Sequence, residues 1–178
     1  MDDLFLVRHG LALPSGSLSP AGLEQASSLG VRIENILSER TREIYEATGE
    51  YPENYLSTQL FVSSTQPRTV ETLKYIVSKF SRNPSSRQHI LEKETFQKDS
   101  SAAVELILSL LKEYSSYRGV PVSLGIVVGH DPIIAHLAAR IVEQNDFVFH
   151  GDEGLLRRTP ECGTYHVRFD GKTVTYLG

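Results

Sequence analysis

Two arginines and two histidines in this 178-residue chain each follow a short apolar segment of the sequence. They are Arg8, His9, Arg68 and His130. Two guanidinium groups repel each other and resist desolvation, so they converge only where an anion lies between them, and their planar forks match phosphoryl oxygens. A neutral imidazole can attack phosphorus and form a phosphohistidine when its tautomer is fixed and the leaving oxygen is stabilised. These residue types predict a phosphate pocket in which one histidine attacks and the other helps to hold the phosphoryl group.

The elements that must position these residues alternate between strands and helices. Short apolar runs typical of buried strands occupy residues 4–7, 60–62, 89–91 and 123–128, and amphipathic patterns separate them. This alternation predicts an α/β fold, a three-layer α/β/α sandwich around a mostly parallel sheet. In such a sheet, ligands bind beyond the carboxyl ends of the strands, which is where the basic residues lie.

The first helix has the clearest signals. Ser19 is predicted as its N-cap and Pro20 as its first residue, and apolar residues follow at helical spacing as far as Leu37. Further helices are predicted at about residues 66–80, 101–117 and 132–144. Pro67 and Pro132 mark turns into two of them, so their N-termini should direct free N–H groups at the same phosphate. Residues 39–58 are polar and poorly periodic, and we predict a mixed helix and loop insertion there.

The end of the chain, YHVRFDGKTVTYL, consists of two alternating runs about Asp170 and Gly171. An Asp-Gly pair between two such runs is the signature of a hairpin with a type I′ turn. The sheet is therefore predicted to end in an antiparallel edge hairpin.

Length and composition limit the class of protein. The chain fits a single domain, residues 1–178, that buries about 70% of its unfolded surface. No apolar run approaches the roughly 18 to 20 residues of a membrane span, and the N-terminus lacks the features of a signal peptide. The net charge is −4 and the basic residues are scattered, unlike the basic stripe of a nucleic-acid binder. The single cysteine, Cys162, excludes an internal disulfide and favours a reducing compartment, so we expect a cytoplasmic protein. From the charge distribution and the lack of a long apolar run, we expect it to bind neither nucleic acid nor membrane.

Four motifs occur in order along the chain: VRHG after the first strand, LSPAGLEQA at the first helix, and SSTQPRTVET and VVGHDP at strand-to-helix turns. Together they resemble the histidine phosphatase superfamily, which has the phosphoglycerate-mutase-like fold. In length and in its GHDP turn, the chain is most similar to the small phosphohistidine phosphatases. The resemblance implies that His9 is the phosphorylated nucleophile and that Arg8, Arg68 and His130 bind the phosphate. It also implies a phosphoenzyme hydrolysed by water, with no metal or other cofactor.

The proton donor to the leaving oxygen is open at this point. A carboxylic acid near the pocket would need its pKa raised by burial. Asp131 resembles the acid of the acid phosphatase and phytase branch, yet it is also placed to cap the next helix, where N–H donors hold a carboxylate ionised. Glu94 and then Glu92 are the alternatives, because the mutase branch takes its acid from a glutamate after the corresponding strand, although ILEKETF departs from that pattern. A phosphohistidine substrate would relax the need for any protein acid.

Other polar residues near the motifs are assigned structural roles. Ser63, Ser64 and Thr65 are predicted to cap the following helix, since no base lies near them in the motif. Arg157 and Arg158 could reach a substrate, but a solvated pair is expected. The remaining residues expected to be structural or on the surface are His89, His136, His150, His166 and Cys162.

The sequence thus predicts a metal-independent phosphatase that acts on a phosphorylated small molecule or a phosphoprotein through His9. A phosphoglycerate-mutase-type phosphotransferase is one alternative, although it would need to shield the phosphoenzyme from water, and no segment looks long enough to form a lid. A phosphate-recognising module without turnover is another. A metal-dependent hydrolase would need further His and Asp ligands, and the sequence has none at suitable positions.

Overall fold

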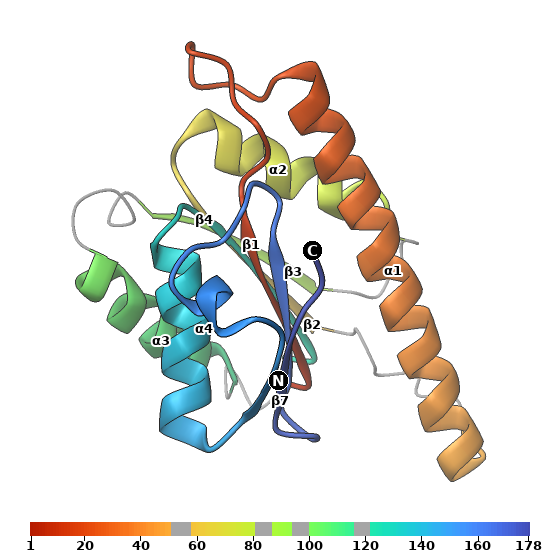
Figure 1. Ribbon diagram of the computed structural model, residues 1–178. Helices are drawn as coiled ribbons and strands as arrows, with labels where there is room; N and C mark the ends of the chain where they lie inside the picture. The colour runs from red at the N-terminus through yellow and green to blue at the C-terminus, as the bar shows by residue number, and fades with distance from the viewer. Residues whose placement is uncertain (51–57, 81–86, 94–99, 116–121) are drawn as a thin grey trace.

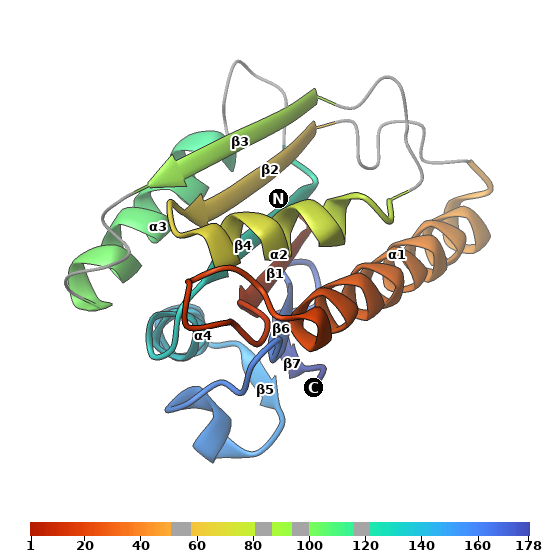
Figure 2. The ribbon, with the colours of Figure 1, turned by 90° about the horizontal axis from the view of Figure 1, so that it is seen from above.

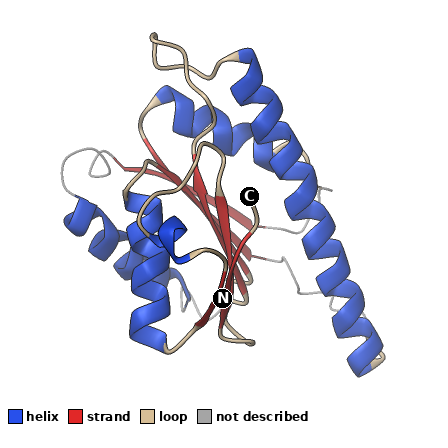
Figure 3. Cartoon of the chain, viewed as in Figure 1, coloured by secondary structure: helices blue, strands red, loops and turns tan. Residues whose placement is uncertain are grey.

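The computed structural model describes residues 1–50, 58–80, 87–93, 100–115 and 122–178. In chain order the elements are β1 (Asp3–Arg8), α1 (Pro20–Thr48), β2 (Thr58–Ser64), α2 (Pro67–Val77), β3 (Arg87–Lys93), α3 (Ser100–Ser115), β4 (Leu124–Gly129), α4 (Ile133–Asn145), β5 (Val148–His150), a short 3-10 helix (Glu153–Leu156), β6 (Thr164–Arg168) and β7 (Thr173–Tyr176). The described strands form one seven-stranded sheet in the order β3-β2-β4-β1-β6-β7-β5. Helices lie on both sides of this sheet (Figure 1, Figure 3).

Two clusters of buried apolar side chains form the cores between the sheet and the helices on its two faces. In β1, Leu4 and Leu6 point to one face of the sheet and Phe5 and Val7 to the other, as the alternation of a strand requires. The Leu4 face is covered by α3 and α4, and the Phe5 face by α1 and α2 (Figure 2). The predicted three-layer α/β/α sandwich is confirmed.

The predicted strands and helices are present, with ends that differ by a few residues except at the C-terminus of α1. The pairs β1–β4, β2–β4 and β2–β3 are parallel, so this half of the sheet is parallel as predicted. The short strand β5 and the 3-10 helix were not predicted, because three or four residues carry too little periodicity to be recognised. Among the described residues, no helix has both the length and the apolar character that crossing a membrane requires.

Helix α1 begins as predicted and runs further than predicted. The Ser19 hydroxyl accepts a hydrogen bond from the N–H of Gly22 (3.1 Å), and Pro20 is the first helical residue. The helix continues to Thr48 and ends at Gly49, whose φ of 73° is left-handed. Residues 39–48 are therefore helix, which corrects the mixed insertion predicted for residues 39–58, while residues 51–57 lie outside the described part. Leu37 is the last buried residue of the helix, so the later turns carry no apolar pattern to detect.

The C-terminal strands β6 and β7 pair antiparallel as predicted, but their turn differs. The ladder ends with Arg168 opposite Thr173, so residues 169–172 connect the strands. Positive φ occurs at Lys172 and at neither Asp170 nor Gly171. A type I′ turn needs positive φ at both central residues, so the predicted turn type is wrong.

Contacts of Phe169 explain the longer loop. Its N–H donates to the carbonyl oxygen of Asp2 (3.1 Å), and its ring packs edge to face against Phe147. The loop is also held by β5, because the N–H of Val148 donates to the carbonyl oxygen of Lys172 (2.9 Å). The strand β5 pairs parallel with β7, so it lies outside the hairpin at the edge of the sheet.

Strands β1 and β4 are neighbours in the sheet, although three helices and two strands separate them in the sequence. Their register pairs Arg8 with Gly129, so the two strands end at the same level. The chain leaves β1 toward α1 on one face and leaves β4 toward α4 on the other. This is a topological switch point, the position where α/β sheets bind ligands. His9 and His130 are the first residues beyond the two strand ends.

Two glycines pack the turn after β1 against the start of α1. A Cβ on Gly10 would lie 2.8 Å from the carbonyl oxygen of Gly22, and a Cβ on Gly22 would overlap the carbonyl oxygen of Leu11. The N–H of Gly10 also donates to the Thr72 hydroxyl of α2 (3.1 Å). Helices α1 and α2 therefore hold the backbone next to His9 by direct contact.

We predict that Gly22→Ala destabilises the protein by about 1–3 kcal/mol, the usual cost of overpacking, because the overlapped atom belongs to the backbone. This loss should exceed the gain of up to about 1 kcal/mol that alanine brings inside a helix. Ser28→Ala, at an exposed position of the same helix, is the control and should change stability little. Urea unfolding measures both variants, and a Gly22→Ala protein as stable as the wild type would contradict the contact.

Candidate active site

His9 and His130 lie edge to face beyond the ends of β1 and β4. Their ring centroids are 5.0 Å apart and the ring planes meet at 65°. Both residues are partly buried. The structure therefore brings together the two histidines that the sequence placed at separate strand ends.

The backbone around His9 fixes which ring nitrogen carries the hydrogen. Nδ1 lies 2.7 Å from the carbonyl oxygen of Gly10, and since a carbonyl only accepts, Nδ1 is the donor. The backbone N–H of His9 donates to the carbonyl oxygen of Gly129 (3.1 Å), which ties the residue to the end of β4. In the neutral ring the lone pair is then on Nε2, the nitrogen that could attack an electrophile.

A chain of hydroxyl groups orients His130. Its Nε2 lies 2.9 Å from Oγ of Ser64, the last residue of β2, and this oxygen lies 2.7 Å from Oγ1 of Thr69. Thr69 Oγ1 in turn donates to the carbonyl oxygen of Gln66 (2.7 Å). The prediction that residues 63–65 cap the next helix holds in part: the N-cap of α2 is Gln66, whose own side chain makes no capping bond, while Ser64 Oγ accepts from the N–H of Gln66 (3.4 Å). The contact joins two neighbouring strands, and only the strand order would have indicated it.

The two arginines are held differently. Arg8 donates from Nη1 to the carbonyl oxygen of Thr159 (2.6 Å), and its Nη2 lies 3.2 Å from Oε1 of Glu161. Arg68 lies in the first turn of α2, and its buried Nε has no hydrogen-bond partner. Within the part of the chain that the structure describes, no carboxylate pairs with the Arg68 guanidinium. The positive charge of Arg68 is therefore not balanced by a direct contact.

Burial and positive charge both disfavour the protonated imidazoles. Burial is the largest cause that lowers the pKa of His9 below 6.5; the Gly10 carbonyl opposes it, and Arg68 and Arg8 add to it. Burial, followed by His9, Arg68 and Arg8, lowers the pKa of His130 to about 4. The charges of the same two guanidiniums, Arg68 and Arg8, therefore lower the pKa of both imidazoles. An anion near these four groups would offset their mutual repulsion.

The loop after β1 is tied to the first turns of α2. The backbone N–H of Arg68 donates to the carbonyl oxygen of Gly16 (3.1 Å), and the carboxylate of Glu71 accepts from the N–H of Leu18 (2.7 Å). The N–H of Arg68 is thus used by the loop, so this part of the predicted helix N-terminal anion site is not available to a ligand. The same bonds hold the loop of residues 11–18 against the start of α2.

Several solved structures resemble the whole chain. A protein assigned as the phosphohistidine phosphatase SixA from Agrobacterium tumefaciens matches with a TM-score of 0.57 and 16% identity, over 95% of this chain and 90% of that chain. A mycobacterial glucosyl-3-phosphoglycerate phosphatase matches with a TM-score of 0.54 and 12% identity, over 99% and 96% of the chains. The phosphoglycerate mutase of Plasmodium falciparum matches with a TM-score of 0.50 and 15% identity, over 99% and 88%. This chain has the histidine phosphatase fold. By sequence, no family model and no curated protein matches it.

Within this histidine phosphatase fold, Asp131 does not cap the helix that follows it. Its Oδ1 accepts a hydrogen bond from the N–H of Thr159 (2.9 Å), and its Oδ2 lies 3.9 Å from Nε of Arg158, whose side chain is exposed. The capping prediction is wrong, since α4 has no side-chain capping bond. An N–H donor and a guanidinium are suitable partners for a carboxylate. Asp131 therefore positions Thr159, whose carbonyl oxygen in turn holds Arg8.

The two other predicted acids stay predictions. Glu94 lies outside the described residues. Glu92 belongs to β3, where its backbone pairs with Ser63 of β2, and only its backbone is described. The strand β3 is at the edge of the sheet, two positions from β4.

Residues 159–163, just before β6, were not predicted to be part of the site. The N–H of Arg8 donates to the carbonyl oxygen of Gly163 (3.0 Å), and the N–H of Cys162 donates to the carbonyl oxygen of His9 (3.2 Å). Cys162 is buried, in keeping with its predicted structural role, and burial, with the charge of Glu161, raises the pKa of its thiol to about 12. These residues could have been found by predicting that the C-terminal hairpin pairs with the first strand. Antiparallel pairing puts the start of β6 beside the end of β1.

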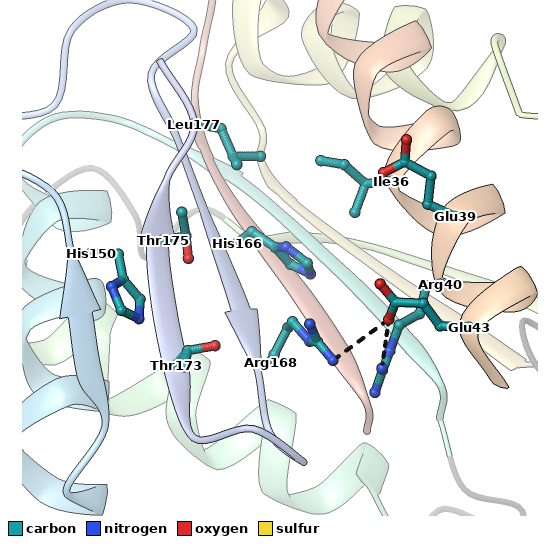
Figure 4. Close-up of a pocket in the computed structure, with 10 residues that line it drawn as sticks. All are labelled: Ile36, Glu39, Arg40, Glu43, His150, His166, Arg168, Thr173, Thr175 and Leu177. Carbon is teal, nitrogen blue, oxygen red and sulfur yellow. Dashed lines mark hydrogen bonds and ion pairs between the residues drawn. The ribbon is translucent and has the colours of Figure 1, made fainter. Parts of the chain in front are cut away.

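A separate cavity of about 390 Å³ lies between α1 and the strands β6 and β7 (Figure 4). It also contains two arginines, but carboxylates balance them. Arg40 pairs with Glu43 (3.2 Å) and with Asp170, and Arg168 lies 3.6 Å from Asp170 and 4.0 Å from Glu43. The excess positive charge is therefore at the strand ends and not in this cavity.

The lowered pKa of His130 predicts how stability depends on pH. The folded value of about 4 lies below the usual 6.5, so below pH 6.5 the unfolded chain binds the proton more readily than the folded chain. The free energy of unfolding should therefore decrease as the pH falls from 6.5 toward 4. His130→Asn should lose less stability over this range, as measured by urea unfolding at about pH 7 and about pH 4.5.

His136→Asn is the matched control, because His136 is exposed on α4. This variant should keep the pH dependence of the wild type. Equal losses of free energy in His130→Asn and the wild type would contradict a buried, neutral His130.

Proposed function

We propose that this protein is a phosphatase of the histidine phosphatase superfamily that hydrolyses a phosphomonoester or a phosphohistidine through a phosphohistidine on His9. The observation that carries the proposal is the geometry of His9. The Gly10 carbonyl holds the hydrogen on Nδ1, which leaves the lone pair on Nε2. The ring of His130 and the unpaired charge of Arg68 act on the same imidazole. A nucleophile and an anion site therefore coincide.

The proposed reaction has two steps. In the first, Nε2 of His9 attacks phosphorus, the bond from phosphorus to the leaving oxygen breaks, and that oxygen takes up a proton. Arg8, Arg68 and His130 stabilise the charge on the three equatorial oxygens. In the second, water attacks phosphorus, the N–P bond breaks, and inorganic phosphate leaves with the neutral imidazole restored.

The structural neighbours support a phosphoryl substrate. One is a protein histidine phosphatase, SixA, solved with tungstate, and another is the mycobacterial glucosyl-3-phosphoglycerate phosphatase, solved with VO₃. Tungstate is a tetrahedral dianion like a phosphate group, and VO₃ has three oxygens like the phosphoryl group in transfer. The two names cover a phosphoprotein and a sugar phosphate, so we propose either class as the substrate of this chain.

The proposed chemistry uses only side chains of this chain. Among the described residues, no group of three or more His, Cys, Asp or Glu side chains could hold a metal ion. Hydrolysis should therefore continue in the presence of a chelator. A phosphoglycerate-mutase-type reaction would differ only in passing the phosphoryl group to a hydroxyl of a second molecule instead of water.

The first test is phosphorylation of His9. The wild type should hydrolyse p-nitrophenyl phosphate, and a radiolabelled phosphomonoester should leave an acid-labile, alkali-stable label on His9. His9→Asn should show neither product nor label, because amide nitrogen is not nucleophilic, while His136→Asn should behave like the wild type. Turnover by His9→Asn would contradict the proposal.

The alternatives give different results in the same assay. Binding of vanadate by the wild type without any turnover would indicate a phosphate-recognising module. Transfer of the label to an added alcohol, in preference to water, would indicate a phosphotransferase.

Arg68 should contribute to ligand binding and not to the stability of the free protein. Arg68→Ala removes one charged hydrogen-bond donor, worth about 1.5–3 kcal/mol, so vanadate should bind roughly 10- to 100-fold more weakly. Without ligand, urea unfolding should show this variant to be at least as stable as the wild type, because the lost guanidinium has no carboxylate partner in the described part of the chain and its loss relieves repulsion within the site. Arg42→Ala, at an exposed position of α1, is the control and should leave vanadate affinity unchanged. Unchanged vanadate affinity in Arg68→Ala would contradict the proposed pocket.

A further inference from the structure

Glu161 lies at the rim of the site, next to the proposed nucleophile. Its Oε1 is 3.2 Å from Nη2 of Arg8, and 43% of its side chain is exposed. The next residue, Cys162, donates its N–H to the carbonyl oxygen of His9 and has a left-handed φ of 54°. Backbone contacts of the next residue thus fix the backbone of Glu161, while the carboxylate at the end of its side chain can reach solvent or a ligand.

The charge of Glu161 acts on the groups around it. It raises the pKa of His9, against the larger lowering by burial, and it adds to burial in raising the pKa of the Cys162 thiol. Arg8 is its only ion-pair partner among the described residues. Among the described residues, the charged and titratable groups that face Glu161 are therefore Arg8, His9 and Cys162, and of these only Arg8 is positively charged.

Asp131 and Glu161 are held by different partners. Asp131 accepts an N–H bond from Thr159 and lies near Arg158, so it is engaged in positioning the backbone. No described N–H group donates to Glu161, and its one partner is the guanidinium that a phosphoryl group would also bind. Occupation of the pocket would therefore change the surroundings of Glu161 more than those of Asp131.

We propose that Glu161 donates the proton to the leaving oxygen of phosphomonoester substrates and then accepts a proton from the attacking water. This inference rests on the proposed phosphatase function. A bound dianion competes for Arg8 and puts a second negative charge beside the carboxylate. Two like charges that share one site disfavour ionisation of both, so Glu161 takes up a proton as the substrate binds.

The atoms balance in both steps. In the first, Nε2 of His9 forms a bond to phosphorus, the P–O bond of the ester breaks, and the leaving oxygen receives the Glu161 proton, which gives an alcohol and a carboxylate. In the second, the carboxylate takes a proton from water, the resulting hydroxide bonds to phosphorus, and the N–P bond breaks. Inorganic phosphate, neutral His9 and protonated Glu161 are the products.

The proposal predicts that the need for Glu161 depends on the leaving group. An alkoxide is strongly basic and needs the proton, whereas p-nitrophenolate leaves without one. Glu161→Gln should therefore lower kcat for an alkyl phosphate such as glycerol phosphate by about 100-fold or more, and kcat for p-nitrophenyl phosphate by only a few-fold. The alkaline limb of the kcat profile for the alkyl phosphate, which reports the protonated acid, should disappear in this variant.

Matched variants make the comparison specific. Glu143→Gln makes the same change at an exposed position of α4 and should leave both rates unchanged. Glu161→Asp, which keeps a carboxylic acid on a shorter side chain, should recover part of the alkyl phosphatase activity. Asp131→Asn and Glu94→Gln compare the other candidate acids, and each should lack the selective loss on the alkyl phosphate.

Three results would overturn the proposal. Equal loss on both substrates in Glu161→Gln would mean that Glu161 only holds Arg8. A selective alkyl loss in Asp131→Asn or Glu94→Gln, with Glu161→Gln active, would assign the acid elsewhere. Hydrolysis of aryl phosphates but no alkyl phosphates by the wild type would mean that no acid operates. Failure of the phosphatase function itself is distinct, because the wild type would then release phosphate from neither substrate and carry no label on His9.

Discussion

The parallel register of β1 against β4 is the constraint on which the site depends. It pairs Arg8 with Gly129, so His9 and His130 leave the sheet at one level with their rings 5.0 Å apart. A shift of one residue would turn each side chain of β1 to the opposite face, and Leu4 would leave the cluster that it forms with α3 and α4. The apolar alternation that stabilises the sheet therefore also fixes the separation of the two imidazoles.

Positive charge is unpaired at the strand ends, whereas the arginines around the separate cavity pair with carboxylates. Around the separate cavity, Arg40 and Arg168 share two carboxylates and hold α1 against the C-terminal strands. At the strand ends, Arg8 has Glu161, while Arg68 has no carboxylate partner among the described residues. The repulsion costs stability in the free protein, and buried clusters on both faces of the sheet offset it. Among the described residues, the other partly buried arginines named here pair with carboxylates, so the unpaired charge of Arg68 is the feature that favours a ligand site over a structural ion-pair network.

Local sequence signals were enough to predict the strands, the helix starts and the basic residues at strand ends, because each depends on a few neighbouring residues. They were not enough where contacts join distant parts of the chain. The bond from Ser64 to His130 depends on β2 lying beside β4, and the pair of Arg8 and Glu161 depends on β6 lying beside β1. The helix beyond Leu37 was missed for another reason, since its later turns pack on no core and show no periodicity.

The hydroxyl chain behind His130 allows the ring to change charge without moving. Burial holds its pKa near 4, so the free pocket contains a neutral imidazole, and a phosphoryl dianion would reverse that preference. The Ser64 hydroxyl can accept a hydrogen bond from Nε2–H of His130 whether the ring is neutral or protonated. It can do so because it donates its own hydrogen to the Thr69 hydroxyl, which in turn donates to the Gln66 carbonyl oxygen. Protonation would then add a hydrogen only at Nδ1, the ring nitrogen that Ser64 does not bind. In the proposed reaction, the pocket would thereby gain a hydrogen-bond donor to the bound anion at His130, beside the Nε2 lone pair of His9.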